Sequence, residues 1–161
     1  MDAFAESAAG VVGPSNVLRE GHEAFESRLF RDPYAFSRDF QYAPPGAISP
    51  ANTKEVQKIV ELANSHGVGL WPVSRGRNLG YGGALPRRST DWVLDLSRLN
   101  GILEVDEELG YAVIEPGVSF FELYEYLKSS KSKFFLSVPD LGYGSVIGNA
   151  LERGIGYSRY G

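Results

Sequence analysis

The stretch of sequence that decides the fold is Pro72-Val73-Ser74-Arg75-Gly76-Arg77-Asn78-Leu79-Gly80-Tyr81-Gly82-Gly83. Its last eight residues contain four glycines, and the apolar run 68–73, which leads into it, predicts a strand. A glycine-rich loop after a strand can turn its backbone N–H groups toward one anion. Further donors come from the side chains of Ser74, Arg75, Arg77 and Asn78. The pattern indicates a diphosphate-binding loop, although a flexible surface turn fits the spacing equally well.

This loop matches neither of two familiar nucleotide-binding motifs. It does not end in Gly-Lys-Ser/Thr, which a P-loop requires. It also lacks a G-x-G-x-x-G that opens a helix, because the chain continues toward an expected strand at 92–96. A dinucleotide that binds here therefore binds to another fold.

A second glycine-rich segment, residues 139–150, follows another apolar run and reads Pro139-Asp140-Leu141-Gly142-Tyr143-Gly144-Ser145-Val146-Ile147-Gly148-Asn149-Ala150. Ser145 can cap a short helix over 146–152. A glycine-rich turn that feeds a helix is also typical of anion or cofactor binding. Two such segments in 161 residues suggest that both hold one extended cofactor.

Both segments resemble those of the vanillyl-alcohol oxidase and p-cresol methylhydroxylase flavoprotein family, as does the intervening Glu115-Pro116-Gly117-Val118. The likeness runs from about Ile48 to Gly161, with the three motifs in order. It implies an α+β fold, the PCMH-type FAD-binding domain, with mixed sheets and flanking helices. The resemblance implies FAD as cofactor, held by Pro72, Ser74, Arg75, Gly76, Arg77, Asn78, Leu79, Gly80, Gly82, Gly83, Pro139, Asp140, Leu141, Gly144, Ser145, Gly148, Asn149 and Gly154.

The resemblance also implies a reaction: oxidation of 4-hydroxybenzyl alcohols or 4-alkylphenols, with hydride transfer from the benzylic carbon to flavin N5. Tyr81 matches the tyrosine that hydrogen-bonds the phenolate oxygen, and Asp140 matches a carboxylate that acts as a base. Tyr157 matches a further active-site tyrosine. The alternatives for Tyr81 and Asp140 are a packed loop aromatic and a helix-preceding cap. A non-catalytic FAD module, or an oxidase of a hydroxy acid or sugar, stays open for the whole chain.

Composition excludes several other classes of function. The chain has no cysteine, which rules out disulfides, thiol catalysis and iron–sulfur clusters, and its two histidines, His22 and His66, are far apart. The net charge of −4 offers no field for nucleic acid. No apolar run approaches the roughly 18 residues of a membrane span, and the acidic N-terminus does not resemble a secretory signal. We therefore expect a cytoplasmic enzyme without a metal, nucleic-acid or membrane partner.

Hydrophobic periodicity supplies the expected elements. A helix capped by Asn52 and ended by Gly67, with His66 solvated at its end, follows a strand at 47–49, which suggests a βαβ-like unit. The sequence also predicts a poorly fixed terminus to residue 14, a helix within 15–30, a hairpin from 103–106 to 111–115, a helix capped by Ser119, and a strand at 134–138.

Residues 1–46 are expected to form an N-terminal extension and residues 47–161 the FAD-binding domain. Because family members are longer, we expect this domain to be truncated here. The full-length protein should be a homo-oligomer that acts on a phenolic small molecule, and the 161 residues alone should be inactive without the C-terminal part.

Overall fold

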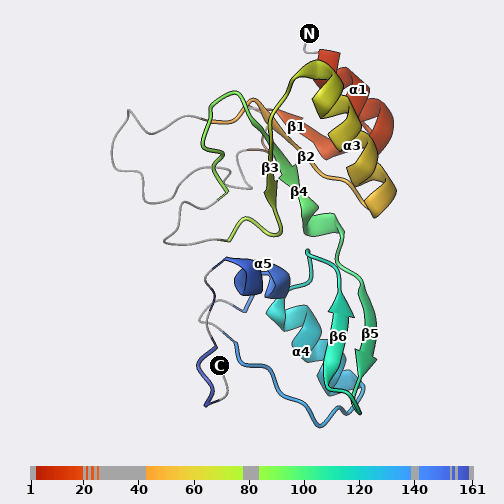
Figure 1. Ribbon diagram of the computed structural model, residues 1–161, viewed down its shortest axis with the longest axis vertical. Helices are drawn as coiled ribbons and strands as arrows, with labels where there is room; N and C mark the ends of the chain where they lie inside the picture. The colour runs from red at the N-terminus through yellow and green to blue at the C-terminus, as the bar shows by residue number, and fades with distance from the viewer. Residues whose placement is uncertain are drawn as a thin grey trace.

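The structure, a computed structural model, describes residues 3–19, 43–77, 84–138 and 142–152, together with 21, 23, 25, 154 and 156–159. Its elements form an upper sheet unit, within residues 3–98, and a lower hairpin unit, within residues 101–152 (Figure 1). Helices and mixed sheets confirm the expected α+β class.

The sheet unit is built on four strands in the order β1-β2-β4-β3. Strand β1 (Val17–Arg19) runs antiparallel to β2 (Gly46–Ile48), whereas β2 and β3 (Leu70–Val73) both run parallel to β4 (Trp92–Asp95). The chain passes from β2 to β3 through helix α3 (Thr53–His66), as the sequence indicates for a βαβ-like unit, with β4 inserted between the two strands.

Helix α3 begins and ends where the sequence indicates. The Asn52 side chain accepts a hydrogen bond from the Glu55 N–H at 3.0 Å, and the Glu55 carboxylate in turn accepts from the Ala51 N–H at 2.7 Å. Gly67 closes the helix with a φ of 65°, a left-handed conformation that glycine adopts without strain. His66 is exposed at the last turn, as expected, with its ring edge-on to Phe4.

The N-terminal residues contradict one expectation, a poorly fixed terminus, and correct part of another, a helix within 15–30. Residues 3–12 form helix α1 (Ala3–Val12), which buries Phe4, Ala5, Ala8 and Val12 against α3 and the sheet, so this terminus is firmly packed. Within 15–30, a 3-10 turn, η1 (Pro14–Asn16), leads into strand β1, where pairing of Val17 with Ile48 along the sheet edge outweighs the weak helical pattern. Further along this stretch the described residues Glu23 and Phe25 are helical, as the sequence predicts.

The sheet is buried on both faces. Ile48, Trp92 and Leu94 point toward α1 and α3, where the Phe4 and Trp92 rings meet edge-on at 5.5 Å. Ala47 and Val93 alternate to the opposite face, where they contact Leu18, Phe25 and Ala84. The residues before 47 thus contribute a helix and a strand to the core; the division at 46/47 stays a prediction.

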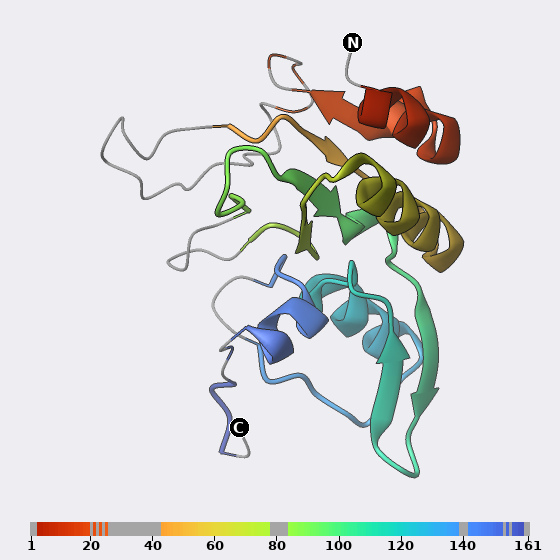
Figure 2. The same cartoon turned by 45° about the horizontal axis from the view of Figure 1, so that its top comes forward.

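A short 3-10 turn, η3 (Leu96–Arg98), joins β4 to the hairpin unit. There β5 (Ile102–Asp106) pairs with β6 (Tyr111–Ile114) around the expected turn, helix α4 (Phe120–Ser129) lies against the hairpin, and α5 (Val146–Leu151) lies beside α4 (Figure 2). Residues 134–138 form no strand, contrary to expectation; no neighbouring strand pairs with them, and they run along α4. None of the described helices is long and apolar enough to cross a bilayer.

Candidate functional site

The first glycine-rich segment leaves the carboxyl end of β3, at the edge of the sheet unit that faces the hairpin unit (Figure 1). Ser74, Arg75, Gly76 and Arg77 are described. Gly76 has a φ of 65°, so the loop needs glycine there. The carboxyl ends of parallel strands are the usual place for ligands in such sheets. The remaining predicted residues of this loop, Asn78, Leu79, Gly80, Tyr81, Gly82 and Gly83, lie outside the described residues.

The second segment forms the turn before α5. The Ser145 hydroxyl donates to the Pro116 carbonyl at 2.6 Å and accepts from the Gly148 N–H at 2.8 Å, so it caps α5 as the sequence indicates. The carbonyls of Gly142 and Gly144 accept from the first two N–H groups of α4. The predicted Pro139, Asp140 and Leu141 fall outside the described residues.

The structure brings the two segments together. A Cβ atom added at Gly148 would overlap the Ser74 hydroxyl, so the first loop passes close to α5 here and Ser74 would have to move to admit a larger residue. The Arg77 guanidinium lies over the Tyr143 ring, 5.6 Å from its centre. Segments that are about 70 residues apart in the chain thus flank one region between the sheet and hairpin units.

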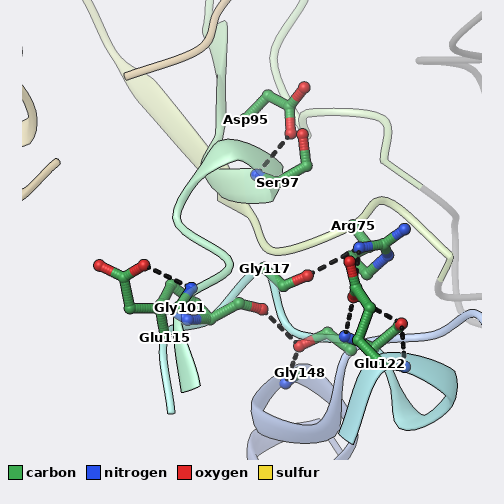
Figure 3. A network of polar contacts seen from close by, with 11 residues as sticks. Arg75, Asp95, Ser97, Gly101, Glu115, Gly117, Glu122 and Gly148 are labelled. Atoms are coloured by element: carbon green, nitrogen blue, oxygen red, sulfur yellow. Dashed lines mark hydrogen bonds and ion pairs between the residues drawn. The ribbon is translucent and has the colours of Figure 1, made fainter. Parts of the chain in front are cut away.

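The turn at Glu115–Val118 is a third component. The Gly117 N–H donates to the Leu99 carbonyl at 2.7 Å, and a Cβ atom at Gly117 would lie 2.6 Å from the Ser97 carbonyl oxygen. This turn therefore lies directly on η3. The Arg75 Nη1 atom donates to the Gly117 carbonyl at 2.7 Å (Figure 3). The sequence marks this turn only by resemblance and assigns it no contact.

Glu122, which completes the capping box of Ser119 at the start of α4, also lies at the candidate site. Its Oε2 atom accepts from the Ser119 N–H at 2.7 Å and from Arg75 Nη1 at 3.2 Å (Figure 3). Burial of the carboxyl raises the pKa of Glu122, but hydrogen bonds from Ser119 and Asn100 and the charge of Arg75 outweigh it and lower the pKa. Glu122 is therefore an ionised link between α4 and the first loop.

The remaining candidate residues are less closely grouped. Pro72 is exposed on β3, and the Asn149 carbonyl accepts from the Gly154 N–H at 2.8 Å beyond α5. Tyr157 is 71% exposed. A groove of about 370 Å³ lies elsewhere, between α4 and residues 132–138, and contains none of the candidate residues.

The donors present suit a diphosphate better than a metal ion. The Ser74 hydroxyl and the Arg77 guanidinium lie where β3 and α5 meet, and both are donors that suit a phosphate oxygen. Among the described residues, no group of three or more histidines or carboxylates could bind a metal. Where it is described, the site is consistent with the FAD that the resemblance implies.

Comparison with known protein families identifies the family of the chain and its cofactor. A family profile described as "FAD binding domain" matches residues 44–161, which is most of the chain and includes both glycine-rich segments. The chain belongs to this FAD binding domain family. FAD is accordingly its cofactor, as the sequence predicts.

Similar proteins place this FAD binding domain among PCMH-type folds. The 4-ethylphenol oxidase of Gulosibacter chungangensis superposes over 98% of the chain with a TM-score of 0.89 and 35% identity. The 4-cresol dehydrogenase [hydroxylating] flavoprotein subunit of Pseudomonas putida is 35% identical over 94% of the chain, and the 1'-carboxy-chondrochloren decarboxylase of Chondromyces crocatus is 46% identical over 70% of it. The chain spans 30%, 29% and 21% of these proteins, respectively.

Proposed function

We propose that this FAD binding domain belongs to an oxidoreductase that oxidises 4-alkylphenols or 4-hydroxybenzyl alcohols. The observation that carries the proposal is the meeting of the two glycine-rich segments at Ser74 and Gly148, in a chain 35% identical to both a 4-ethylphenol oxidase and a 4-cresol dehydrogenase subunit. Bound FAD supplies the two-electron acceptor for such a reaction.

The chain's own residues have distinct roles in this proposal. Ser74, Arg77 and the backbone around Gly76 and Gly148 hold the cofactor. The Tyr81 hydroxyl donates a hydrogen bond to the phenolate oxygen, and the Asp140 carboxylate acts as the base toward the substrate. These assignments for Tyr81, Asp140 and Tyr157 remain predictions, as do the homo-oligomer and the inactivity of residues 1–161 alone.

The direct test is anaerobic reduction of the flavin in the full natural-length protein, followed by stopped-flow absorbance. We expect 4-ethylphenol or vanillyl alcohol to bleach the flavin band, and glycolate and glucose to leave it intact. Bleaching by glycolate or glucose alone would replace this proposal with the hydroxy-acid or sugar alternative. A yellow protein that none of these compounds reduces would favour a non-catalytic FAD module.

Two substitutions test the residue roles. Asp140→Ser should slow flavin reduction by roughly 10²–10⁴-fold, the usual contribution of a general base, while FAD stays bound. Reduction within twofold of the unmodified protein would eliminate this role.

Tyr81→Phe should weaken phenols more than their para-methoxy analogues, because a charge-assisted hydrogen bond contributes roughly 1.5–3 kcal/mol. Equal losses for the two substrate types would show that Tyr81 only packs.

A second candidate comes from the relative named as a decarboxylase, which is 46% identical to the chain. A protein with that activity would release carbon dioxide from a carboxylated substrate. Carbon dioxide measured beside flavin reduction, with 4-hydroxymandelate as the probe, separates the two candidates. Release in step with substrate consumption would favour decarboxylation, and flavin reduction without release would favour simple oxidation.

A further inference from the structure

Arg75 joins the two units of the molecule. Its Nη1 atom donates to the Gly117 carbonyl at 2.7 Å and to the Glu122 carboxylate at 3.2 Å, whereas Arg75 itself stands in the loop that follows β3 (Figure 3). We propose that Arg75 is a positioning residue: it fixes the diphosphate loop against the hairpin unit and so pre-forms the FAD site, instead of binding the diphosphate itself.

The two acceptors are held in place by their own contacts. Gly117 donates to Leu99 and is enclosed by the carbonyls of η3, so its own carbonyl has a fixed direction. The Glu122 carboxylate accepts from both the N–H and the hydroxyl of Ser119, at 2.7 and 2.6 Å. A guanidinium that bridges two fixed acceptors loses little freedom in doing so and holds its loop in one place.

Charge supports this role. The Glu122 carboxylate balances the Arg75 guanidinium at 3.2 Å, and the Arg75 side chain is only 28% exposed. A neutralised cation adds little attraction for a second anion. Arg77, two residues further on, is exposed and stacks over Tyr143, so it is the better placed of the two to meet a diphosphate. Of the two arginines in this loop, Arg75 thus positions the loop and Arg77 binds the diphosphate.

The energetic consequence is preorganisation. A loop already fixed in its bound conformation does not have to be ordered when FAD binds, and the affinity rises by the ordering cost that is avoided. Glu122 therefore contributes to FAD affinity although it is itself an anion. The direction in which FAD affinity changes when the Glu122 carboxylate is removed distinguishes positioning from direct phosphate binding. If Arg75 bound the phosphate directly, loss of the competing carboxylate would make FAD bind more tightly.

The experiment measures the affinity of the flavin-free, full natural-length protein for FAD, by quenching of flavin fluorescence, and for ADP, by calorimetry. Arg75→Met should weaken both by roughly tenfold, equal to about 1.4 kcal/mol. Arg75→Lys should recover about half of that loss on a logarithmic scale, because an ammonium can make one of the two contacts. Glu122→Gln should weaken binding by roughly threefold, the order of a partly exposed ion pair. The double variant should match Arg75→Met, because the two residues act as a unit.

Two control variants separate this role from a loss of charge or of stability. Lys58→Met removes one exposed positive charge from α3, and Ile59→Val loosens the core of the sheet unit. Neither should change FAD or ADP affinity. Arg75→Met should also leave the salt dependence of ADP binding unchanged, since no phosphate contact is lost.

Three results would overturn the inference: tighter ADP binding by Glu122→Gln, a weaker salt dependence in Arg75→Met, or additive losses in the double variant. If Arg75→Met does not fold, the direction of the change in FAD and ADP affinity in Arg75→Lys and Glu122→Gln decides between positioning and direct binding. The inference depends on FAD binding and not on the substrate. A protein that binds FAD but oxidises no phenol therefore refutes the proposed function and leaves the role of Arg75 to these measurements.

Discussion

The sheet unit buries both faces of its two central strands, β2 and β4, whereas the hairpin unit covers only one side of its two strands. In the sheet unit, helices α1 and α3 close one face over Ile48, Ile59 and Trp92. In the hairpin unit, the fully buried core is Val118, Leu123 and Leu127. Large apolar side chains there stay exposed, among them Leu103 at 65%, Leu109 at 74%, Phe121 at 58% and Phe135 at 72%.

This difference shows how the site is organised. The sheet unit has an extensive hydrophobic core, and the first glycine-rich loop leaves from its edge. The hairpin unit is positioned by specific polar contacts to that edge, through Arg75, Glu122 and the Gly117 turn. The proposed FAD region lies where a well-packed unit meets a unit that is held by polar contacts, so substitutions in the core and substitutions in the polar contacts should have separable effects.

The largest effect is expected in the core of the sheet unit. Ile59 is fully buried, and Ile59→Ala should cost about 3–5 kcal/mol in the free energy of unfolding, because the cavity has rigid walls on α1 and the sheet. Leu123→Ala in the hairpin unit should cost less, about 2–3 kcal/mol, since its partly exposed neighbours can move into the space.

Urea denaturation of the purified chain measures both losses. Val60→Ala, on the exposed face of α3, is the matched control and should change stability by less than about 1 kcal/mol. A larger loss at Leu123 than at Ile59 would contradict the comparison and show that the hairpin unit carries the stronger core.

Sequence reasoning worked well where local chemistry determines structure. Asn52 and Ser119 both start helices with their side chains on the N–H three residues later, because this cap needs only one turn of chain. The hairpin turn and the two glycine-rich segments are equally local. The family resemblance then predicted the FAD fold from motif order alone.

Sequence reasoning failed where contacts distant in the chain decide. Residues 3–12 look weakly patterned by themselves, but the Phe4 ring contacts the ring of Trp92, some 90 residues later in the chain. This contact holds helix α1 in place. The apolar run 134–138 has the pattern of a strand, although none of the described strands pairs with it. Arg75 and Glu122 are 47 residues apart in the chain, and no local sequence pattern predicts their contact.

The second prediction concerns the contact between the units. Gly148→Ala would drive a methyl group into the Ser74 hydroxyl and close to Ser145, so we expect a loss of about 1–3 kcal/mol in stability together with weaker FAD binding. Ser74→Gly, added to Gly148→Ala, removes the obstructing side chain and should restore most of the stability. Gly10→Ala is the control, since nothing lies within 4 Å of its added methyl group on α1. Denaturation without rescue by Ser74→Gly would mean that the two loops do not meet there.

The smallest effect is a pH dependence confined to the polar link. The pKa of Glu122 lies below its ordinary value of 4.5. Burial alone would raise this pKa, but the Ser119 hydrogen bonds, the Arg75 charge and the Asn100 hydrogen bond together lower it by more than burial raises it. A carboxyl group whose pKa is lower in the folded state stabilises the fold above the unfolded value, and this stabilisation is lost as the pH falls through the folded pKa. Lowering the pH from 6 to below 4.5 should therefore weaken the link, by less than about 1 kcal/mol because both side chains are partly exposed.

Glu122→Gln should flatten this part of the stability profile, whereas Glu61→Gln, on the exposed face of α3, should leave it unchanged. The measurement is the urea midpoint at successive pH values for the three proteins. An identical pH slope for Glu122→Gln and the unmodified chain would show that Glu122 is not ionised as a link, and would leave packing at Gly117 and Gly148 as the connection between the two units.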